Sequence, residues 1–113
     1  MFRKRRKFTI GNANPFSQAK ERHPLSVVGD FYVENRCCTA CGVPDVTAPD
    51  LIGWTDEKVS HCYWGRQPET EAELEQAFKL LDHQELGCHR YAGTDPKIQA
   101  RIGRESCDHP VIR

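Results

Sequence analysis

The loop over residues 35–51, with the sequence NRCCTACGVPDVTAPDL, constrains this chain more than any other stretch. Within it, Cys38 and Cys41 form a C-x2-C pair, a spacing that lets a tight turn direct two thiolates at one metal. Gly42 follows directly, and glycine adopts a positive φ without steric cost, as such a turn often requires. A single C-x2-C pair fits a zinc knuckle, half of an iron–sulfur site or a redox pair.

Further ligands must come from elsewhere in the chain. A thioredoxin-type motif is a poor fit because it opens a long helix, whereas Pro44 and Pro49 interrupt the segment after Cys41. A four-thiolate site therefore needs two more sulfurs than the C-x2-C pair supplies. The remaining cysteines are Cys37, Cys62, Cys88 and Cys107.

Each of these cysteines has two interpretations, as a ligand or as a small buried apolar side chain. Consecutive side chains usually diverge, so Cys37 and Cys38 are awkwardly placed to bind the same metal atom. Cys107 lies near the chain end, is the poorest candidate ligand and is interpreted as a free thiol.

Two histidines adjoin two of these cysteines. His61 precedes Cys62, and His89 follows Cys88. Histidine can replace a thiolate on zinc or on one iron of a two-iron cluster. A polar residue at the end of a strand is the other interpretation, and we prefer it for both histidines.

The length and composition limit the class of protein. With 113 residues the chain forms one small domain, and its 38% hydrophobic content supports a modest core. No apolar run reaches membrane-spanning length, and no secretory signal follows the basic N-terminus, so we expect a cytoplasmic protein. In that reducing compartment, six cysteines are expected as ligands or thiols rather than as disulfides.

The zero net charge hides an uneven distribution along the chain. Residues 1–23 carry seven bases against one acid, which gives +6, and residues 24–113 carry nine bases against fifteen acids, which gives −6. We interpret residues 1–23 as a basic flexible arm, residues 24–104 as the domain and residues 105–113 as a C-terminal tail. The arm lacks an aromatic platform for stacking bases, so we do not expect nucleic-acid binding.

The periodicity of apolar residues predicts both helices and strands. The clearest element is a helix over residues 70–81, where Thr70 and Glu73 form a capping box and apolar residues recur at helical spacing. A second short helix is expected over residues 94–103, which contain a capping aspartate followed by proline. The other expected elements are a strand within residues 25–35, a helical turn before Pro49, a hairpin over residues 51–65 and a strand over residues 88–93.

Residues 29–52, GDFYVENRCCTACGVPDVTAPDLI, resemble the cluster loop of small bacterial ferredoxins with a single 4Fe–4S cluster. In that family a strand ending in an aromatic residue leads to C-x2-C-G-x-C, and a short helix then ends in Ala-Pro and an apolar residue. The match here comprises the aromatic strand residues 31–33, the Cys38, Cys41 and Gly42 motif, and residues 48–51. The resemblance extends from residue 27 to about residue 92.

The resemblance implies a ferredoxin-like α+β fold with a short antiparallel sheet and two helices. Cys88 occupies the place of the family's last ligand, whereas the family's third cysteine falls on Pro44, which cannot bind metal. Cys62 is our choice for the missing ligand because the predicted hairpin brings it beside the loop, and Cys37 is the alternative. A three-cysteine cluster with one open iron is a further option.

The resemblance therefore implies an electron carrier with a 4Fe–4S cluster bound by Cys38, Cys41, Cys62 and Cys88, and a protein redox partner. The acidic body suits this role because negative charge steers a carrier to basic partners. The alternative is a Zn²⁺-binding or metal-free ferredoxin-like protein that acts as a protein–protein interaction module. We expect a monomer that contacts no membrane, and no enzymatic activity, because the sequence shows no convincing nucleophile–base pair.

Overall fold

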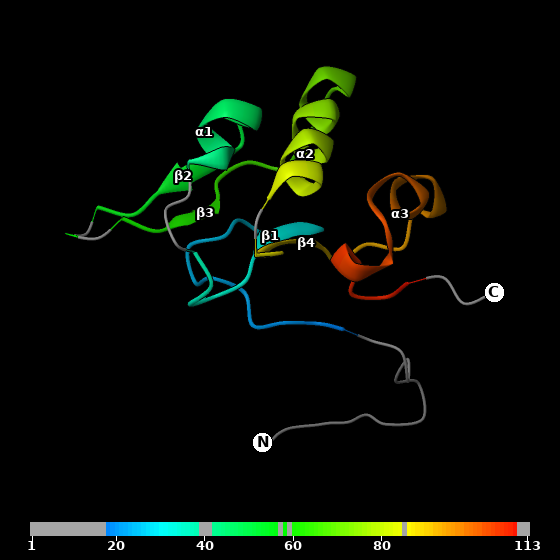
Figure 1. Cartoon of the computed structure of the whole chain (residues 1–113), viewed down its shortest axis with the longest axis horizontal. Helices are drawn as coiled ribbons and strands as arrows, with labels where there is room; N and C mark the ends of the chain where they lie inside the picture. The colour runs from blue at the N-terminus through cyan, green and yellow to red at the C-terminus, as the bar shows by residue number, and fades with distance from the viewer. Residues whose placement is uncertain (1–17, 39–41, 57, 59, 85, 111–113) are drawn as a thin grey trace.

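A computed structural model describes residues 18–38, 42–56, 58, 60–84 and 86–110 of the chain. Within these residues the chain forms three α-helices and two antiparallel sheets of two strands each, which pack as a small α+β domain (Figure 1). The predicted α+β class is confirmed. The expected single sheet is instead two separate pairs of strands, and the helical turn expected before Pro49 forms a third short helix, α1, Val43–Thr47.

The first sheet joins parts of the chain that are far apart in the sequence. Strand β1, Phe31–Val33, pairs antiparallel with β4, His89–Tyr91, so that Val33 lies opposite His89. All the residues of both strands are buried. Beyond the strands, the backbone N–H of Glu34 donates to the carbonyl of Cys88 at 2.7 Å. The pairing therefore holds the loop that follows β1 beside the residue that precedes β4.

The second sheet is the predicted hairpin. Strand β2, Ile52–Trp54, pairs antiparallel with β3, Cys62–Trp64, and Trp54 lies opposite Cys62. Strand β3 packs beside β1, where the fully buried Trp64 stacks on Phe31 with ring centroids 5.1 Å apart. This packing joins the two sheets into one core and brings the start of β3 toward the loop that follows β1.

Helix α2, Glu71–His83, covers this core and confirms the helix predicted over residues 70–81 (Figure 1). Its N-cap forms as expected, because the Thr70 hydroxyl accepts the backbone N–H of Glu73 at 3.1 Å. The Glu73 carboxylate accepts the N–H of Glu69 rather than that of Thr70, so the reciprocal bond of the capping box is shifted by one residue. The face that packs on the core comprises Ala77, Phe78, Leu80 and Leu81.

The second predicted helix is also present, as α3, Pro96–Ile102. It begins where the sequence indicates, since the Asp95 carboxylate accepts the backbone N–H of Lys97 at 2.9 Å. It ends at Gly103, whose φ of 90° lies in the left-handed region that glycine tolerates best. A short 3-10 helix, η1, Arg104–Ser106, follows.

The two segments at the ends of the described chain lie against β4. Residues 107–110, which belong to the predicted C-terminal tail, pack on this strand, and the N–H of Asp108 donates to the Tyr91 carbonyl at 2.9 Å. Residue 18, assigned to the basic arm, joins them, because the Gln18 N–H donates to the Asp108 carbonyl at 2.7 Å. The rest of the predicted arm before residue 18, and residues 111–113, lie outside the described residues.

A buried ion pair fixes these end segments. Arg90 of β4 and Asp108 are nearly inaccessible, and the Arg90 Nε donates to the Asp108 Oδ1 at 2.8 Å. The Tyr32 hydroxyl donates to the other carboxylate oxygen at 2.5 Å. We call these three residues the Arg90–Asp108–Tyr32 cluster. Because successive side chains of a strand point to opposite faces, Arg90 and His89 face opposite sides of the β1–β4 sheet.

Candidate functional site

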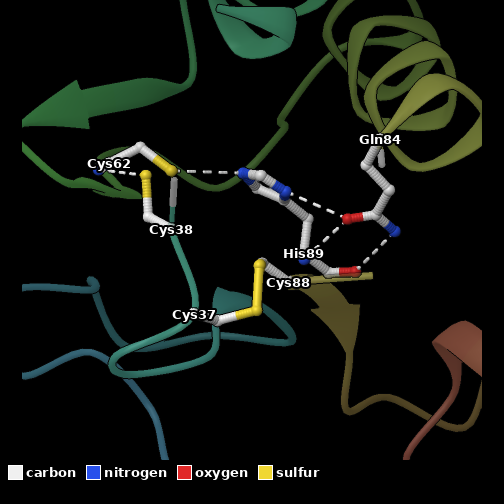
Figure 2. The surroundings of a disulfide bond; sticks show 6 residues. All are labelled: Cys37, Cys38, Cys62, Gln84, Cys88 and His89. Atoms are coloured by element: carbon white, nitrogen blue, oxygen red, sulfur yellow. Dashed lines mark hydrogen bonds between the residues drawn. A yellow bond between two sulfur atoms is a disulfide. The ribbon is translucent and has the colours of Figure 1, made fainter. Parts of the chain in front are cut away.

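Four cysteines from three separate segments come together where β4 begins (Figure 2). Cys37 and Cys38 lie in the loop after β1, Cys62 is the first residue of β3, and Cys88 directly precedes β4. The sulfurs of Cys37 and Cys88 form a disulfide that joins residues 51 positions apart. This bond fixes the loop to the start of β4.

Cys38 contacts a different partner from its neighbour Cys37. Its sulfur accepts the backbone N–H of Cys62, with an N···S distance of 3.2 Å. Cys62 is buried, whereas Cys38 is partly exposed and lines a cavity of about 540 Å³ together with His23 and His61. The two consecutive cysteines therefore diverge, as expected, and Cys38 forms the accessible edge of the site.

His89 extends the site from β4. Its Nε2 lies 3.4 Å from the Cys62 sulfur, and its Nδ1 lies 3.0 Å from the Oε1 of Gln84, the residue that caps the C-terminus of α2. The amide of Gln84 is itself oriented by the backbone of His89. Its Oε1 accepts the His89 N–H at 2.7 Å, and its Nε2 donates to the His89 carbonyl at 3.1 Å.

These contacts determine the tautomer of His89. The Oε1 of Gln84 can only accept a hydrogen bond, so the Nδ1 of His89 must carry the proton. The Nε2 of His89 then presents a lone pair, and the Cys62 thiol donates to it. The imidazole thus directs an unprotonated nitrogen, rather than an N–H group, toward the Cys62 sulfur.

Burial controls the charge of this imidazole. His89 is 3% exposed, and the loss of solvation lowers its pKa from 6.5 to about 4. The ring is therefore neutral near pH 7. Trp64 of β3 packs against it, with the ring centroids 6.3 Å apart and the planes inclined at 63°. The Cys62 sulfur and the neutral Nε2 of His89 consequently lie together on the buried side of the site, beside Trp64.

We refer to Cys37, Cys38, Cys62, Cys88 and His89 as the cysteine–histidine ring, because their contacts form a closed path. The chain itself joins the two consecutive pairs, and the disulfide joins Cys37 to Cys88. Hydrogen bonds then connect Cys38 to Cys62 and Cys62 to His89. Thiolate with imidazole is the donor chemistry of zinc and iron–sulfur centres. The same sulfurs also provide the chemistry of thiol–disulfide exchange.

Three of the four predicted metal ligands belong to this ring. Cys38, Cys62 and Cys88 belong to it, whereas Cys41 lies outside the described residues. The alternative ligand Cys37 is bonded to Cys88, and a sulfur within a disulfide is not a thiolate ligand. This bond differs from our expectation that the cysteines stay out of disulfides. Among the residues that the structure describes, no three cysteine, histidine or acidic side chains are arranged to hold one metal ion, and the ligand set stays a prediction.

Two residues outside the ring, Cys107 and Pro44, also bear on the predicted metal site. Cys107 carries a thiol, as predicted, and its sulfur donates to the Gly103 carbonyl at 3.2 Å while burial raises the pKa of the thiol. Pro44, where the resembling family has a cysteine, is buried in the first turn of α1, a position that tolerates proline because its N–H has no helical partner.

Reasoning from the sequence did not identify the roles of His89 and Gln84. The sequence favours a polar residue at a strand end for His89, and its position next to Cys88 is the only signal of a role in the site. Gln84 lies in the turn after α2, where no local pattern indicates that its amide folds back onto β4. These two residues become visible as part of the site only when α2 and β4 are placed together.

Within the described parts of the chain, no helix combines the length and the apolar character needed to cross a membrane. Comparisons with known protein families, with curated proteins and with solved structures find no match to this chain. The function must therefore be inferred from the geometry and chemistry of the cysteine–histidine ring.

Proposed function

We propose that this protein is a small ferredoxin-like electron carrier that binds an iron–sulfur cluster of the 4Fe–4S type at the cysteine–histidine ring. The observation that supports this proposal is the convergence of distant cysteines. Cys62 of β3 and Cys88 at the start of β4 both reach the loop of Cys37 and Cys38. The proposed ligands are the sequence-predicted set, of which Cys38, Cys62 and Cys88 belong to the ring and Cys41 lies outside the described residues.

This ligand set requires that the disulfide be opened. Two electrons and two protons convert the bond between Cys37 and Cys88 into two thiols, and either of them can then lose its proton to bind iron. A cytoplasmic location, which we also propose, provides thiol reductants that perform this step. Cys37 is thus released together with Cys88 and stays the alternative ligand.

The surroundings of the ring suit electron transfer. When bound, a cluster supplies one-electron oxidation and reduction. Trp64 and the imidazole of His89 exclude water from the buried side, while Cys38 places the opposite edge near the surface. Residues 24–113 carry a net charge of −6, which favours encounter with a basic redox partner protein. We propose a monomer that acts without binding a membrane or nucleic acid.

Cys62 and His89 of the ring, together with the neighbouring Gln84, also provide the elements of a nucleophile, a base and an orienting group. Cys62 is only 1% exposed, however, so a substrate cannot reach its sulfur in this conformation. This burial favours a binding role for the thiol over covalent catalysis, and we propose no enzymatic activity.

A second candidate is supported by the disulfide itself. The bond between Cys37 and Cys88 already cross-links the loop to the start of β4. A structural metal would provide the same cross-link, so none is needed for this purpose. The chain would then be a ferredoxin-like protein–protein interaction module, either metal-free or with Zn²⁺ on the remaining sulfurs. This candidate needs no electron transfer and no change in the disulfide.

Purification without oxygen and in the presence of a thiol reductant separates the two candidates. The visible spectrum is recorded, and iron, zinc and acid-labile sulfide are measured for each protein chain. Broad visible absorption with iron and sulfide in similar amounts supports the cluster. A colourless protein with one zinc per chain, or with no metal, overturns the electron carrier in favour of the second candidate.

Single serine substitutions then test the ligand set. Cys62→Ser and Cys88→Ser should each lower the iron content, and Cys37→Ser should do so only if Cys37 is a ligand. Cys107→Ser is the matched control, because this buried thiol bonds the Gly103 carbonyl outside the ring. Iron content that is unchanged in Cys62→Ser and Cys88→Ser shows that the ligand set is wrong.

A further inference from the structure

We propose that His89, rather than Cys88, supplies the metal ligand from the β4 side, with its Nε2 binding the same metal as the Cys62 sulfur. This inference rests on the proposed function in one respect, namely that the cysteine–histidine ring binds a metal. It changes the ligand set, because a metal bound through His89 leaves the disulfide between Cys37 and Cys88 in place.

The tautomer of His89 is the first observation that carries this inference. A histidine binds metal through an unprotonated nitrogen, and the Nε2 of His89 is held in that form by the contact of Nδ1 with Gln84. A metal-binding histidine almost always donates its other N–H to a carbonyl or a carboxylate, and the Gln84 Oε1 fills this place.

The separation of the two donor atoms is the second observation. Bond lengths of about 2.3 Å for zinc–sulfur and about 2.0–2.1 Å for zinc–nitrogen, at a tetrahedral angle, place the two ligand atoms about 3.5 Å apart. The Cys62 sulfur and the His89 Nε2 are 3.4 Å apart. Replacing the thiol proton with a metal ion therefore requires little movement of either side chain.

The directions of neighbouring side chains are the third observation. Cys88 and His89 are consecutive, and their side chains diverge, because the Cys88 sulfur bonds Cys37 while the His89 ring faces Cys62. The Cys88 side chain therefore leads to Cys37, and the His89 ring is the group of this pair that contacts Cys62. Cys38 lies on the His89 side, since its sulfur accepts the N–H of Cys62. A mixed thiolate and imidazole site of this kind suits Zn²⁺ or iron.

The test uses the whole protein with the disulfide intact and with histidine labelled by ¹⁵N. The protein is purified without thiol reductant, the disulfide is verified by mass spectrometry, and bound metal is removed with a chelator. One equivalent of ¹¹³Cd²⁺ then serves as a spectroscopic substitute for zinc in NMR. We expect a single cadmium resonance in which sulfur ligation is accompanied by a ¹⁵N coupling to one histidine.

Two variants identify that histidine without relying on one substitution alone. His89→Ala should abolish the ¹⁵N coupling, whereas His83→Ala, which changes an exposed histidine at the end of α2, should leave it unchanged. Gln84→Leu keeps the imidazole but removes its orienting partner, and should weaken cadmium binding by about 10–100-fold.

The outcomes distinguish this inference from the proposed function. Cadmium bound without ¹⁵N coupling overturns the role of His89. Cadmium that binds only after the disulfide is reduced, again without coupling, also overturns it and supports Cys88 as the ligand. Failure of the protein to bind cadmium in either redox form overturns both the inference and the proposed metal site.

Discussion

Two consecutive residues of β4, His89 and Arg90, belong to two buried polar sites on opposite faces of the sheet. The imidazole of His89 is neutral, whereas Arg90 is charged. His89 belongs to the cysteine–histidine ring, where its imidazole is neutral and the sulfur atoms can exchange protons, partners or metal. Arg90 belongs to the Arg90–Asp108–Tyr32 cluster, where its guanidinium pairs with the Asp108 carboxylate. The Tyr32 hydroxyl occupies the other carboxylate oxygen. The guanidinium also donates to the backbone carbonyls of Glu105, Gln18 and Cys107.

The difference shows how one short strand can serve function on one face and stability on the other. A buried ion pair whose hydrogen bonds are satisfied within the chain has nothing left to offer a ligand. Apart from the disulfide, the cysteine–histidine ring is connected by hydrogen bonds that involve sulfur, and the thiols and imidazole that make them can bind something else. We therefore expect changes on the Arg90 side to alter stability alone, and changes on the His89 side to alter metal binding and to make stability depend on pH and redox state.

The largest effect is expected from the charged face. Arg90→Leu leaves the Asp108 carboxylate buried without its cation and should lower the free energy of unfolding by about 3–5 kcal/mol, as measured by urea denaturation. The surface pair of Arg101 and Asp82, with side chains about 40% exposed, provides the control, because Arg101→Leu should cost at most about 1 kcal/mol. Similar losses in the two variants would contradict the distinction between the buried cluster and the surface.

Reduction of the disulfide is expected to have the next largest effect. The bond closes a loop of 51 residues, and its loss frees the unfolded chain, which lowers the free energy of unfolding by up to about 4 kcal/mol. Urea denaturation of the metal-free protein with and without a thiol reductant measures the change. The Cys37→Ser/Cys88→Ser double variant should be insensitive to reductant, and a response in that variant would place the sensitive bond elsewhere.

The free energy of unfolding should depend on pH through His89. The pKa of His89 is about 4 in the folded protein and about 6.5 in the unfolded chain, so the unfolded chain binds more protons between these values. The contribution of the neutral His89 to the free energy of unfolding is complete above pH 6.5. It is lost as the pH falls toward 4, and the total loss is about 3 kcal/mol. Stability measured across this range in metal-free wild type and in His89→Gln isolates the effect, because other acids titrate equally in both. Parallel curves would show that His89 is not held neutral.

The smallest change in the free energy of unfolding should come from Tyr32, the uncharged member of the Arg90–Asp108–Tyr32 cluster. Burial, reinforced by the hydrogen bond to Asp108, raises the pKa of Tyr32, so its hydroxyl stays protonated and donates to the carboxylate. Tyr32→Phe removes this charged hydrogen bond and should lower the free energy of unfolding by about 2 kcal/mol. Tyr63→Phe changes a half-buried tyrosine of β3 and should have a smaller effect. A larger loss in Tyr63→Phe would show that the hydroxyl bond to Asp108 contributes little.

The elements that the sequence predicts well are those with local signals. Thr70 and Asp95 cap helices through contacts two or three residues away, and such contacts can be read from a short window of sequence. The hairpin of β2 and β3 also depends on nearby residues, and it brings Cys62 beside Cys38 as expected. The class of the fold and part of the site therefore follow from patterns of a few residues.

The features that sequence reasoning missed depend on contacts across the whole chain. The partner of Cys37 is determined by the pairing of β1 with β4, which places Cys88 next to the loop after β1. Residues 107–110 are held by the ion pair of Asp108 with Arg90 and by backbone contacts with Tyr91, both of which are distant in sequence. Neither contact leaves a periodic signal, because a single acid or cysteine is equally compatible with an exposed position.

The span of the disulfide also has a consequence for the newly made protein. Synthesis proceeds from the N-terminus at about 5–20 residues per second, so Cys88, which is 51 positions after Cys37, is made roughly 3–10 seconds later. During that interval Cys38, Cys41 and Cys62 have been made, so Cys37 meets other thiols before its partner Cys88 exists. Correct pairing on the ribosome therefore depends on keeping the early sulfurs reduced until β4 arrives.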